Sequence, residues 1–293
     1  MFSLSECRAW MTIDLTVSVA IVAFNLSTII VFTKSFNLRK RSTYLLINLA
    51  FVDMLVGGFS VYALFYSVGA NRCSVWKRHS IEVWVNYTLF TLLLMFCNAS
   101  LTNIAIIALE RLHATFFPFR HHLLRKWVYG LVITIVWVTA ALETVTDVLL
   151  QRLEIVFLHL RIIFCSTCLL IICVSYTSIV IKVRCGTRLQ HHGAASRERK
   201  LTITLLIVTA VSLLLYLPYV ILAFIVSSFE SELWLSLPDS VDHAIIVLFY
   251  ANSLVNPILY AIRLPEYRSA VFSLFCNRSR RQRQVADVPL RHE

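Results

Sequence analysis

The stretch "IALERLHATFFPFRH", residues 107–121, ends a long apolar run with a carboxylate and a guanidinium side by side, Glu110 and Arg111. A helix of about 20 apolar residues crosses the bilayer core of about 30 Å, and the run that precedes this pair is long enough. A charge costs far less at the end of such a helix than at the bilayer centre. The stretch therefore predicts a membrane-spanning helix whose charged pair lies at the water boundary.

Composition extends this interpretation to the whole chain. Of the 293 residues, 58% are hydrophobic and 15% are charged, whereas a soluble domain usually has about 25% charged residues. The long apolar runs do not alternate in polarity as strands of a membrane barrel would. We expect seven spanning helices at about 11–33, 43–68, 84–112, 127–149, 155–182, 201–227 and 241–262. The predicted fold is an all-α membrane protein that forms a single seven-helix domain over 1–293, because no loop is long enough for a soluble domain.

The charge distribution predicts the orientation. Basic side chains gather in alternate loops, which marks the cytoplasmic side. They lie within residues 34–41, 120–126, 182–200 and 263–283. We therefore expect the N-terminus outside and the C-terminus in the cytoplasm, with no cleaved signal peptide and the first helix as the insertion signal. The net charge of +11 suits an anionic inner leaflet better than nucleic acid.

Short motifs stand in order along these runs. They are Asn25, "NLAFVD" ending at Asp53, "ERL" at 110–112, Trp137, Tyr176, Pro218, and "NSLVNPILY" with Asn256, Pro257 and Tyr260. They are followed by "RLPEYRSAVFSLFC" at 263–276. Together they resemble the motifs of the rhodopsin-like (class A) family of G-protein-coupled receptors. The resemblance covers nearly all of the chain and implies a plasma-membrane receptor with an extracellular ligand and a heterotrimeric G protein as partners. It also implies a short amphipathic eighth helix at 265–275, against the membrane lipids, and a basic cytoplasmic tail at 276–293.

The resemblance assigns an activation switch to the cytoplasmic half. Arg111 corresponds to the arginine that meets the G protein, and Glu110 to the acidic residue that holds it. Glu198 stands at the base of the sixth helix, where many relatives have a second carboxylate that locks the arginine. Tyr176, Pro218, Asn256, Pro257 and Tyr260 match the residues that move with it. The alternative is a surface ion pair of about 0–1 kcal/mol.

Asp53 is a carboxylate near the bilayer midplane, and burial without partners would be very unfavourable. Polar residues at similar depth are Ser100, Asn252, Ser253 and Asn256. They predict an oxygen-rich cage, and the family implies an allosteric sodium ion there and no other cofactor. A water-filled cluster or a protonated Asp53 remains the alternative.

The sequence also departs from the family. Asn86 replaces the usual helix-three cysteine, so Cys7 and Cys73 remain as the outer pair, either bridged or as two free thiols. The fifth helix has Cys168 where a proline is usual, and the sixth has Tyr216 in place of a tryptophan. Receptors for melanocortin peptides share the absent cysteine and the absent proline. Cannabinoid and lysophospholipid receptors share some of these departures, and the seventh helix and the tail also resemble those of adenosine receptors.

The expected ligand pocket lies between the outer halves of the helices. Its residues are Leu93, Leu94, Cys97, Glu143, Arg161, Tyr216, Tyr219, Phe249 and Tyr250, with Asp147 and Asp242 at the rim. Leu93 stands where amine receptors have an aspartate, which favours a non-amine ligand, either a peptide or a lipid. Glu143 and Arg161 are candidates for ligand contact or for a bridge to each other.

Other functions have less support. We find no H-E-x-x-H, no G-x-S-x-G and no paired catalytic carboxylates, so we expect no enzyme. A transporter would usually show repeated halves and interrupted helices. A decoy or non-signalling receptor is the nearer alternative, because "ERL" and "LYLP" differ from the family's usual motifs. Cys276 follows an amphipathic stretch and is a candidate for palmitoylation.

Overall fold

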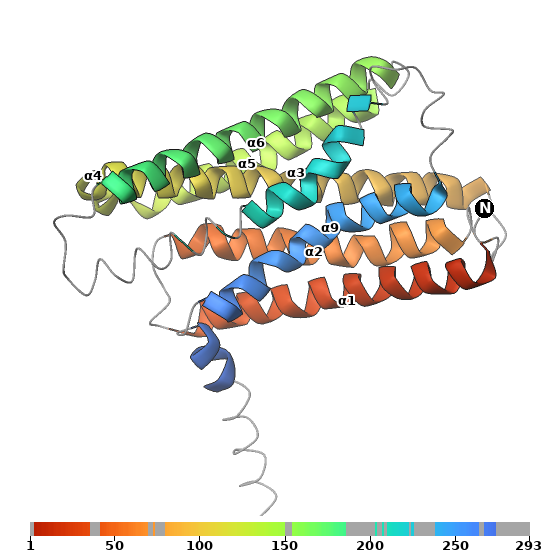
Figure 1. Cartoon of the computed structure of the whole chain (residues 1–293), viewed down its shortest axis with the longest axis horizontal. Coiled ribbons are helices and arrows are strands. Elements are labelled where there is room, and N and C mark those ends of the chain that lie inside the picture. The colour runs from red at the N-terminus through yellow and green to blue at the C-terminus, as the bar shows by residue number, and fades with distance from the viewer. Residues whose placement is uncertain are drawn as a thin grey trace, which may run out of the picture.

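The computed structural model describes residues 3–35, 42–69, 73, 80–149, 154–185, 203, 207, 210–222, 224–225, 238–263 and 267–273. Within these ranges the regular structure is helical and no strand occurs. Seven helices have defined bounds: α1 (Leu4–Lys34), α2 (Thr43–Ser67), α3 (Ser80–Phe116), α4 (Pro118–Leu123), α5 (Lys126–Leu149), α6 (Glu154–Cys185) and α9 (Asp239–Arg263). Residues 210–222 and 267–273 are also helical. The chain is thus an all-α bundle (Figure 1).

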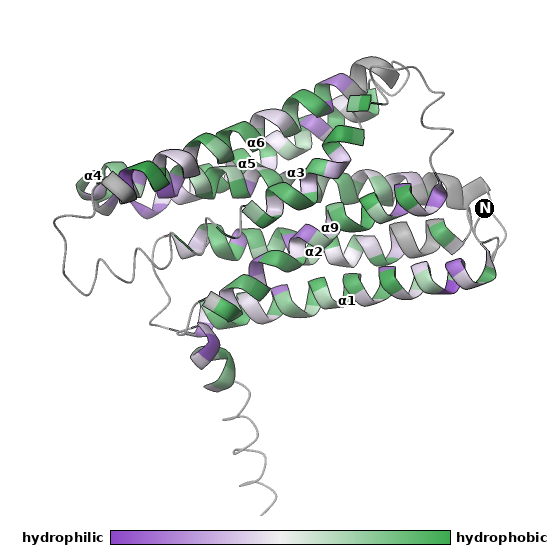
Figure 2. Ribbon diagram, in the orientation of Figure 1, coloured by the Kyte–Doolittle hydropathy of each residue, from purple (hydrophilic) through white to green (hydrophobic). Residues whose placement is uncertain are grey.

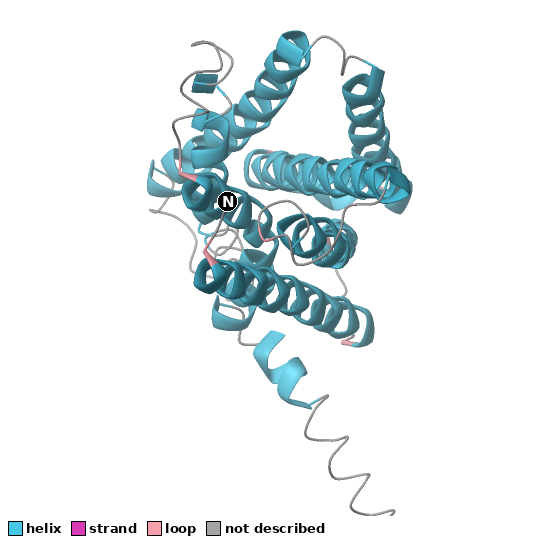
Figure 3. Cartoon of the chain, turned by 90° about the vertical axis from the view of Figure 1, so that its right-hand side faces the viewer, coloured by secondary structure: helices cyan, strands magenta, loops and turns pink. Residues whose placement is uncertain are grey.

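The helices form two groups joined by α3. In Figure 1, α1, α2 and α9 lie together on one side, α5 and α6 lie on the other, and α3 runs between them. We call the end of the bundle that carries Cys7 and Cys73 the disulfide end, and the end that carries Arg111 the arginine end. Figure 3 looks at the bundle from the disulfide end, where the N-terminus faces the viewer.

α1 begins at Leu4, earlier than the start at 11 that the apolar run predicts. The reason is a capping box around Ser3. The Glu6 backbone N–H donates to the Ser3 hydroxyl at 3.3 Å, and the Ser3 backbone N–H donates to a Glu6 carboxylate oxygen at 2.8 Å. These bonds satisfy two donors at the helix start, so the polar first turn is helical as well.

α3 also extends beyond the predicted 84–112, because it begins at Ser80 and ends at Phe116. An apolar run gives the length that suits a bilayer, and a helix can continue beyond it with polar side chains in water. The short helix α4 follows after one residue and was not predicted. Pro118 lies in its first turn, where a missing backbone N–H costs nothing.

α1 and α2 pack at very close range at Gly57. A Cβ atom added there would lie 2.7 Å from Ile21 Cγ2 and 2.9 Å from the Ser18 carbonyl oxygen. The Ser18 and Ser60 hydroxyls hydrogen bond at 2.7 Å beside this contact. Small residues at such contacts let membrane helices approach closely, and this contact sets the spacing of the α1–α2 pair.

The chain is a multi-pass membrane protein. Among the described residues, six helices are long and apolar enough to cross a membrane, and Ala210–Leu222 is a shorter apolar helix within the predicted sixth span. Figure 2 shows the hydrophobic colour along the long helices. Large apolar side chains such as Leu142, Ile163 and Leu170 are exposed on the outside of the bundle, as a lipid-facing surface requires.

The predicted surface helix at 265–275 is helical over 267–273, and its other residues lie outside the described ones. The buried Tyr267 joins it to the bundle. Its hydroxyl hydrogen bonds to Thr28 of α1 at 2.8 Å, and its ring lies 5.7 Å from Phe32 and 6.1 Å from Tyr260. Burial raises the pKa of the Tyr267 hydroxyl, so this group stays a neutral hydrogen-bond partner. α1, α9 and the segment 267–273 therefore meet at one aromatic cluster.

Candidate functional site

A carboxylate is fully buried in the middle of the bundle. Asp53 of α2 has no exposed surface. The hydroxyls of Ser100 (α3) and Ser253 (α9) donate to its Oδ1 at 2.6 and 2.8 Å, and Asn256 Nδ2 donates to its Oδ2 at 2.8 Å. Three of the four predicted partners therefore converge on Asp53. The fourth, Asn252, is buried but makes no hydrogen bond to Asp53, so its part in the cage stays a prediction. Consecutive helical residues point in different directions, which separates Asn252 from Ser253.

The donor set around Asp53 suits a small hard cation. Both carboxylate oxygens and two hydroxyl oxygens lie together, and the Asn256 Oδ1 is buried with no hydrogen-bond partner. Oxygen ligands of this kind bind hard cations. Among the described residues no group of three or more His, Cys, Asp or Glu side chains is placed to hold a metal. The arrangement fits a weakly held ion with one carboxylate ligand better than a transition metal.

Asn25 and Trp137 have local structural roles. Asn25 Nδ2 donates to the carbonyl oxygens of Ile21 and Ser253, both at 2.9 Å, and so ties α1 to α9 beside the Asp53 cluster. Trp137 Nε1 donates to Asn48 Oδ1 at 3.2 Å, which ties α5 to α2. These bonds hold the backbone around Asp53 in place from two sides.

The arginine end contains the Glu110–Arg111 pair. Arg111 Nε lies 2.9 Å from Glu110 Oε2, and Arg111 is only 3% exposed. A guanidinium this deeply buried needs a counter-charge. Glu110 supplies it from the neighbouring position of α3, so the arginine is held inside the bundle and away from water.

Three further side chains hold Glu110, and the sequence did not reveal them. Ser42 Oγ donates to Glu110 Oε1 at 2.7 Å, His121 Nε2 of α4 lies 2.6 Å from the same oxygen, and the Tyr129 hydroxyl of α5 donates to it at 3.4 Å. Glu110 therefore joins α3 to α4, to α5 and to the start of α2. In the sequence, the only indication of a role for Ser42 is its position just before an apolar helix. No sequence feature indicates a role for His121, because α4 itself was not predicted.

The other predicted switch residues have separate positions. Tyr176 of α6 and Tyr260 of α9 are both buried, and the Tyr260 ring lies 5.9 Å from Phe32. Pro257 is inside α9, and Pro218 is inside the helical stretch 210–222. Glu198, the predicted lock partner of Arg111, and Cys276 lie outside the described residues.

Aromatic side chains from two helices meet in the predicted pocket. The Phe249 ring of α9 lies 4.4 Å from Tyr219 and 5.1 Å from Tyr216, both of the 210–222 helix. The guanidinium of Arg161 lies over Tyr219, 5.6 Å from the ring centroid. Arg161 is only 5% exposed, so a cation of α6 is enclosed beside this aromatic group.

The remaining predicted pocket residues lie on α3, α5 and α9. Leu93 and Cys97 are buried and Leu94 is half-buried on α3, Glu143 is half-buried on α5, and Asp242 is buried on α9. The side chain of Asp147 lies outside the described ones. The predicted bridge between Glu143 and Arg161 stays a prediction.

Tyr250 differs from its prediction in one respect. It is buried in α9, but its hydroxyl donates to Asp14 Oδ1 of α1 at 2.9 Å. The Asp14 carboxylate is also within hydrogen-bond distance of His243, whose Nε2 lies 3.1 Å from Oδ2 and 3.2 Å from Oδ1. The sequence analysis did not single out Asp14 or His243. A carboxylate inside the first apolar run was the signal that could have found them.

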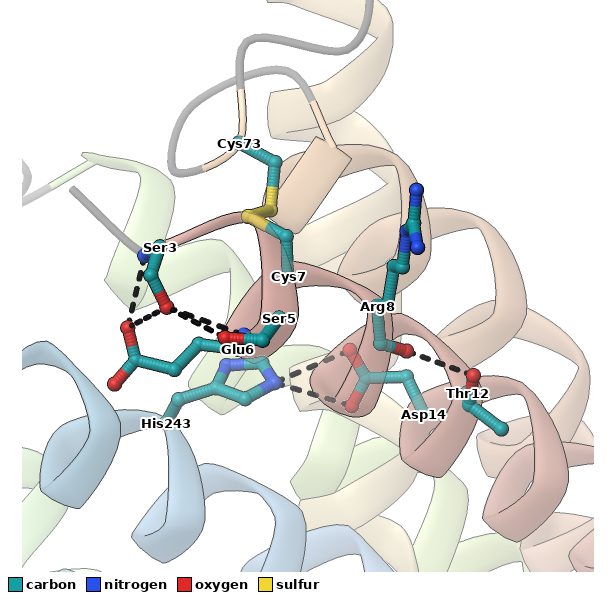
Figure 4. The surroundings of a disulfide bond; sticks show 9 residues. All are labelled: Ser3, Ser5, Glu6, Cys7, Arg8, Thr12, Asp14, Cys73 and His243. Carbon is teal, nitrogen blue, oxygen red and sulfur yellow. Dashed lines mark hydrogen bonds and ion pairs between the residues drawn. A yellow bond between two sulfur atoms is a disulfide. The ribbon is translucent and has the colours of Figure 1, made fainter.

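Cys7 and Cys73 form a disulfide bond, with Cα atoms 5.7 Å apart. Figure 4 shows the bond at the disulfide end, where it links the first turns of α1 to the segment after α2. Of the two alternatives that the sequence left open, the structure contains the bridge.

The comparisons agree with one another. The family model described as 7 transmembrane receptor (rhodopsin family) matches residues 149–260, which include Tyr176, Pro218, Asn256 and Tyr260. The histamine H2 receptor of Homo sapiens is 26% identical over 308 residues, which cover 94% of this chain and 81% of that receptor. Trace amine-associated receptor 365 of Petromyzon marinus is 27% identical over 298 residues, covering 89% of this chain and 78% of that receptor. A 5-hydroxytryptamine receptor of Lymnaea stagnalis is 39% identical over 85 residues, or 29% of this chain and 16% of that receptor.

Proposed function

Because the chain belongs to the rhodopsin-like family of seven-transmembrane receptors, we propose that ligand binding at its aromatic pocket is passed to Arg111, which acts on a heterotrimeric G protein. Members of this family are receptors and not enzymes. They bind an extracellular ligand and signal through a G protein. The parts that remain to be assigned are the orientation, the resting contact of Arg111 and the class of ligand.

We assign the disulfide end to the outside of the plasma membrane and the arginine end to the cytoplasm. The concentration of basic residues in alternate loops supports this orientation. The Cys7–Cys73 bond supports it independently, because disulfides persist in oxidising compartments and are rare in the cytosol.

The single observation that carries the signalling proposal is the burial of Arg111 against Glu110. In this arrangement the guanidinium is 3% exposed and cannot reach a partner protein. Release of Arg111 from Glu110 would expose a cation at the cytoplasmic end. Glu198 is proposed as a second carboxylate that holds Arg111 at rest. A ligand drives the release if it binds the released state more tightly than the resting one.

Asp53 is proposed to hold a sodium ion in the resting receptor. The oxygen-rich donor set and the buried, unpartnered Asn256 Oδ1 support this assignment. When bound, the ion would neutralise the Asp53 carboxylate. Ser100 from α3 and Ser253 from α9 would hold the ion between these two helices.

The pocket favours a ligand with an acidic group, such as a lipid or a peptide. The supporting observation is the enclosed Arg161 guanidinium over Tyr219, with the apolar Leu93 at the place where the family's amine receptors have an aspartate. A biogenic amine is the second candidate, because two relatives are named for histamine and for trace amines. An amine would need a carboxylate on another helix, and Glu143 of α5 and Asp242 of α9 are the candidates on the described part of the pocket.

Nucleotide exchange on a panel of G proteins tests the proposal. We expect basal exchange from the parent on at least one G protein, its loss in Arg111→Ala, and an increase in Glu198→Ala. Arg120→Ala, which removes an exposed arginine from the neighbouring α4, is the matched control and should keep the parent's exchange. All variants are compared at equal surface expression. A parent that drives no exchange on any G protein would support the decoy alternative instead.

Adding acidic lipids, peptides, histamine and other primary amines to the same assay distinguishes the ligand classes. Arg161→Gln should abolish the response to an acidic ligand and spare that to an amine, whereas Glu143→Gln should do the reverse.

A further inference from the structure

A buried acid–base pair joins α1 to α9 near the disulfide end. Asp14 is fully buried and His243 is 2% exposed. His243 Nε2 lies within 3.2 Å of both Asp14 oxygens, and the Tyr250 hydroxyl donates to Oδ1. The Trp10 ring covers the imidazole edge-on at 4.9 Å. Figure 4 shows His243 pointing across from α9 toward the Asp14 carboxylate of α1.

We propose that the Asp14–His243 pair is a proton-binding site that couples extracellular pH to the position of α9 and its pocket residue Tyr250. Histidine is the side chain whose charge normally changes between about pH 5 and pH 8. A buried carboxylate is strongly destabilised unless an opposite charge accompanies it. The proton on His243 supplies that charge, and the resulting hydrogen bond is roughly twice as strong as one between neutral groups.

Few other charged or titratable groups face the pair among the described residues. From α1, Glu6 lies nearer the helix start and its carboxylate accepts a hydrogen bond from Ser240 at 3.3 Å. From α9, Asp239 and Asp242 lie within four residues of His243, and Tyr250 completes the set. α2 contributes the uncharged Ser60 beside Ser18. Arg8 points away from the pair in Figure 4.

The pair is placed to affect ligand binding. Tyr250 belongs to the predicted pocket, and its hydroxyl is held on α1 by the same carboxylate. Phe249, the preceding residue on α9, packs edge-on against Tyr216 and at a tilt against Tyr219. Movement of α9 relative to α1 would therefore change both the pocket and the segment that leads to Asn256.

The direction of the expected pH effect follows from the arrangement of the arginine end in this structure. In this structure Arg111 is held by Glu110, which we propose is the resting arrangement, so the direction of the signalling effect rests on the proposed function. Proton binding should strengthen the α1–α9 contact in this arrangement. Acid should therefore stabilise the folded receptor and lower basal signalling, and both effects should be lost as pH rises and His243 becomes neutral.

The first measurement is thermal unfolding of the purified full-length receptor from about pH 5.5 to about pH 8. The parent should unfold at progressively lower temperature as pH rises across this range. His243→Gln keeps a hydrogen-bond donor but cannot take the charge, and Asp14→Asn keeps the shape without the carboxylate. Both should lose this pH dependence. His159→Gln, an exposed histidine of α6, should keep it, as should Tyr250→Phe, which leaves the pair intact.

The second measurement is basal nucleotide exchange over the same external pH range. We expect it to fall about fivefold or more on acidification in the parent, a typical lower limit for allosteric coupling, and to stay level in His243→Gln. The same pH dependence in parent and His243→Gln in both assays would overturn the proton site. A pH-dependent unfolding midpoint that vanishes in His243→Gln, in a receptor that activates no G protein, would support the proton site and reject the proposed signalling function.

Discussion

At the scale of single residues, buried carboxylates organise this bundle. Asp14, Asp53 and Glu110 lie at three levels. Asp14 is held by Tyr250 and His243 of α9, and Asp53 accepts hydrogen bonds from α3 and α9. Glu110 accepts them from Ser42 before α2 and from Tyr129 of α5. Because an unpaired carboxylate is very costly in the membrane, each one fixes the side chains around it. The three carboxylates connect the pair at the disulfide end, the proposed ion site and the arginine at the arginine end through α9 and α3.

The Asp53 cluster gives a direct test at this scale. Asp53→Asn removes the charge that would hold a cation but keeps an amide that can hydrogen bond to Ser100 and Ser253. We expect sodium to lower basal nucleotide exchange in the parent and to have no effect in Asp53→Asn. Potassium chloride at equal ionic strength is the salt control. Sodium sensitivity that persists unchanged in Asp53→Asn would reject the site.

Sequence motifs located the residues around Asp53 well and those around Glu110 poorly. Ser100, Ser253 and Asn256 occur at polar positions within apolar runs, where a buried role is the natural interpretation. Ser42 and His121 lie in connecting segments, where polar residues are ordinary. Their contact with Glu110 depends on how α4 folds back against α3, and a linear pattern does not contain that information.

At the scale of helices, six predicted spans coincide with long apolar helices among the described residues, and the predicted span at 201–227 contains the shorter helix 210–222. Apolar runs record the part of each helix that lies at the depth of the membrane, so they missed the capped start of α1 and both ends of α3. The close approach of α1 and α2 was also missed, because "GG" at 57–58 gives no hint of which glycine faces the neighbour. In the structure Gly57 is buried against Ile21, and nothing lies within 4 Å of a Cβ added at Gly58.

These two glycines provide a matched pair of variants. Gly57→Ala would place a methyl group 2.9 Å from the Ser18 carbonyl oxygen, so the α1–α2 contact must open. We expect a loss of about 1–3 kcal/mol, as for other overpacked sites, seen as a lower unfolding temperature. Gly58→Ala should be neutral or gain about 0.5–1 kcal/mol from higher helix propensity. Equal unfolding temperatures for the two variants would contradict the close packing at Gly57.

At the scale of the whole molecule, the disulfide end is held together by contacts that differ from those of the resembled family. The family's tether from helix three is missing, and α1 takes over part of its role. The Cys7–Cys73 bond ties α1 to the segment after α2. The bonds from Asp14 to His243 and Tyr250 tie α1 to α9. The N-terminal helix therefore links the segment after α2 to α9 at the disulfide end.

Removal of the disulfide tests this arrangement. The bond closes a loop with a sequence separation of 66 residues, for which the chain-entropy model gives roughly 4 kcal/mol. Cys7→Ser, Cys73→Ser and the double variant should lower the unfolding temperature by equal amounts, because each breaks the same bond. Cys173→Ser, which changes an exposed free cysteine of α6, should leave it unchanged. If the parent's stabilisation came from the two side chains separately, the double variant would fall below both single ones. Mass spectrometry of unreduced, alkylated receptor from the cell surface decides the point directly, since alkylation of Cys7 in the folded parent would contradict the bridge.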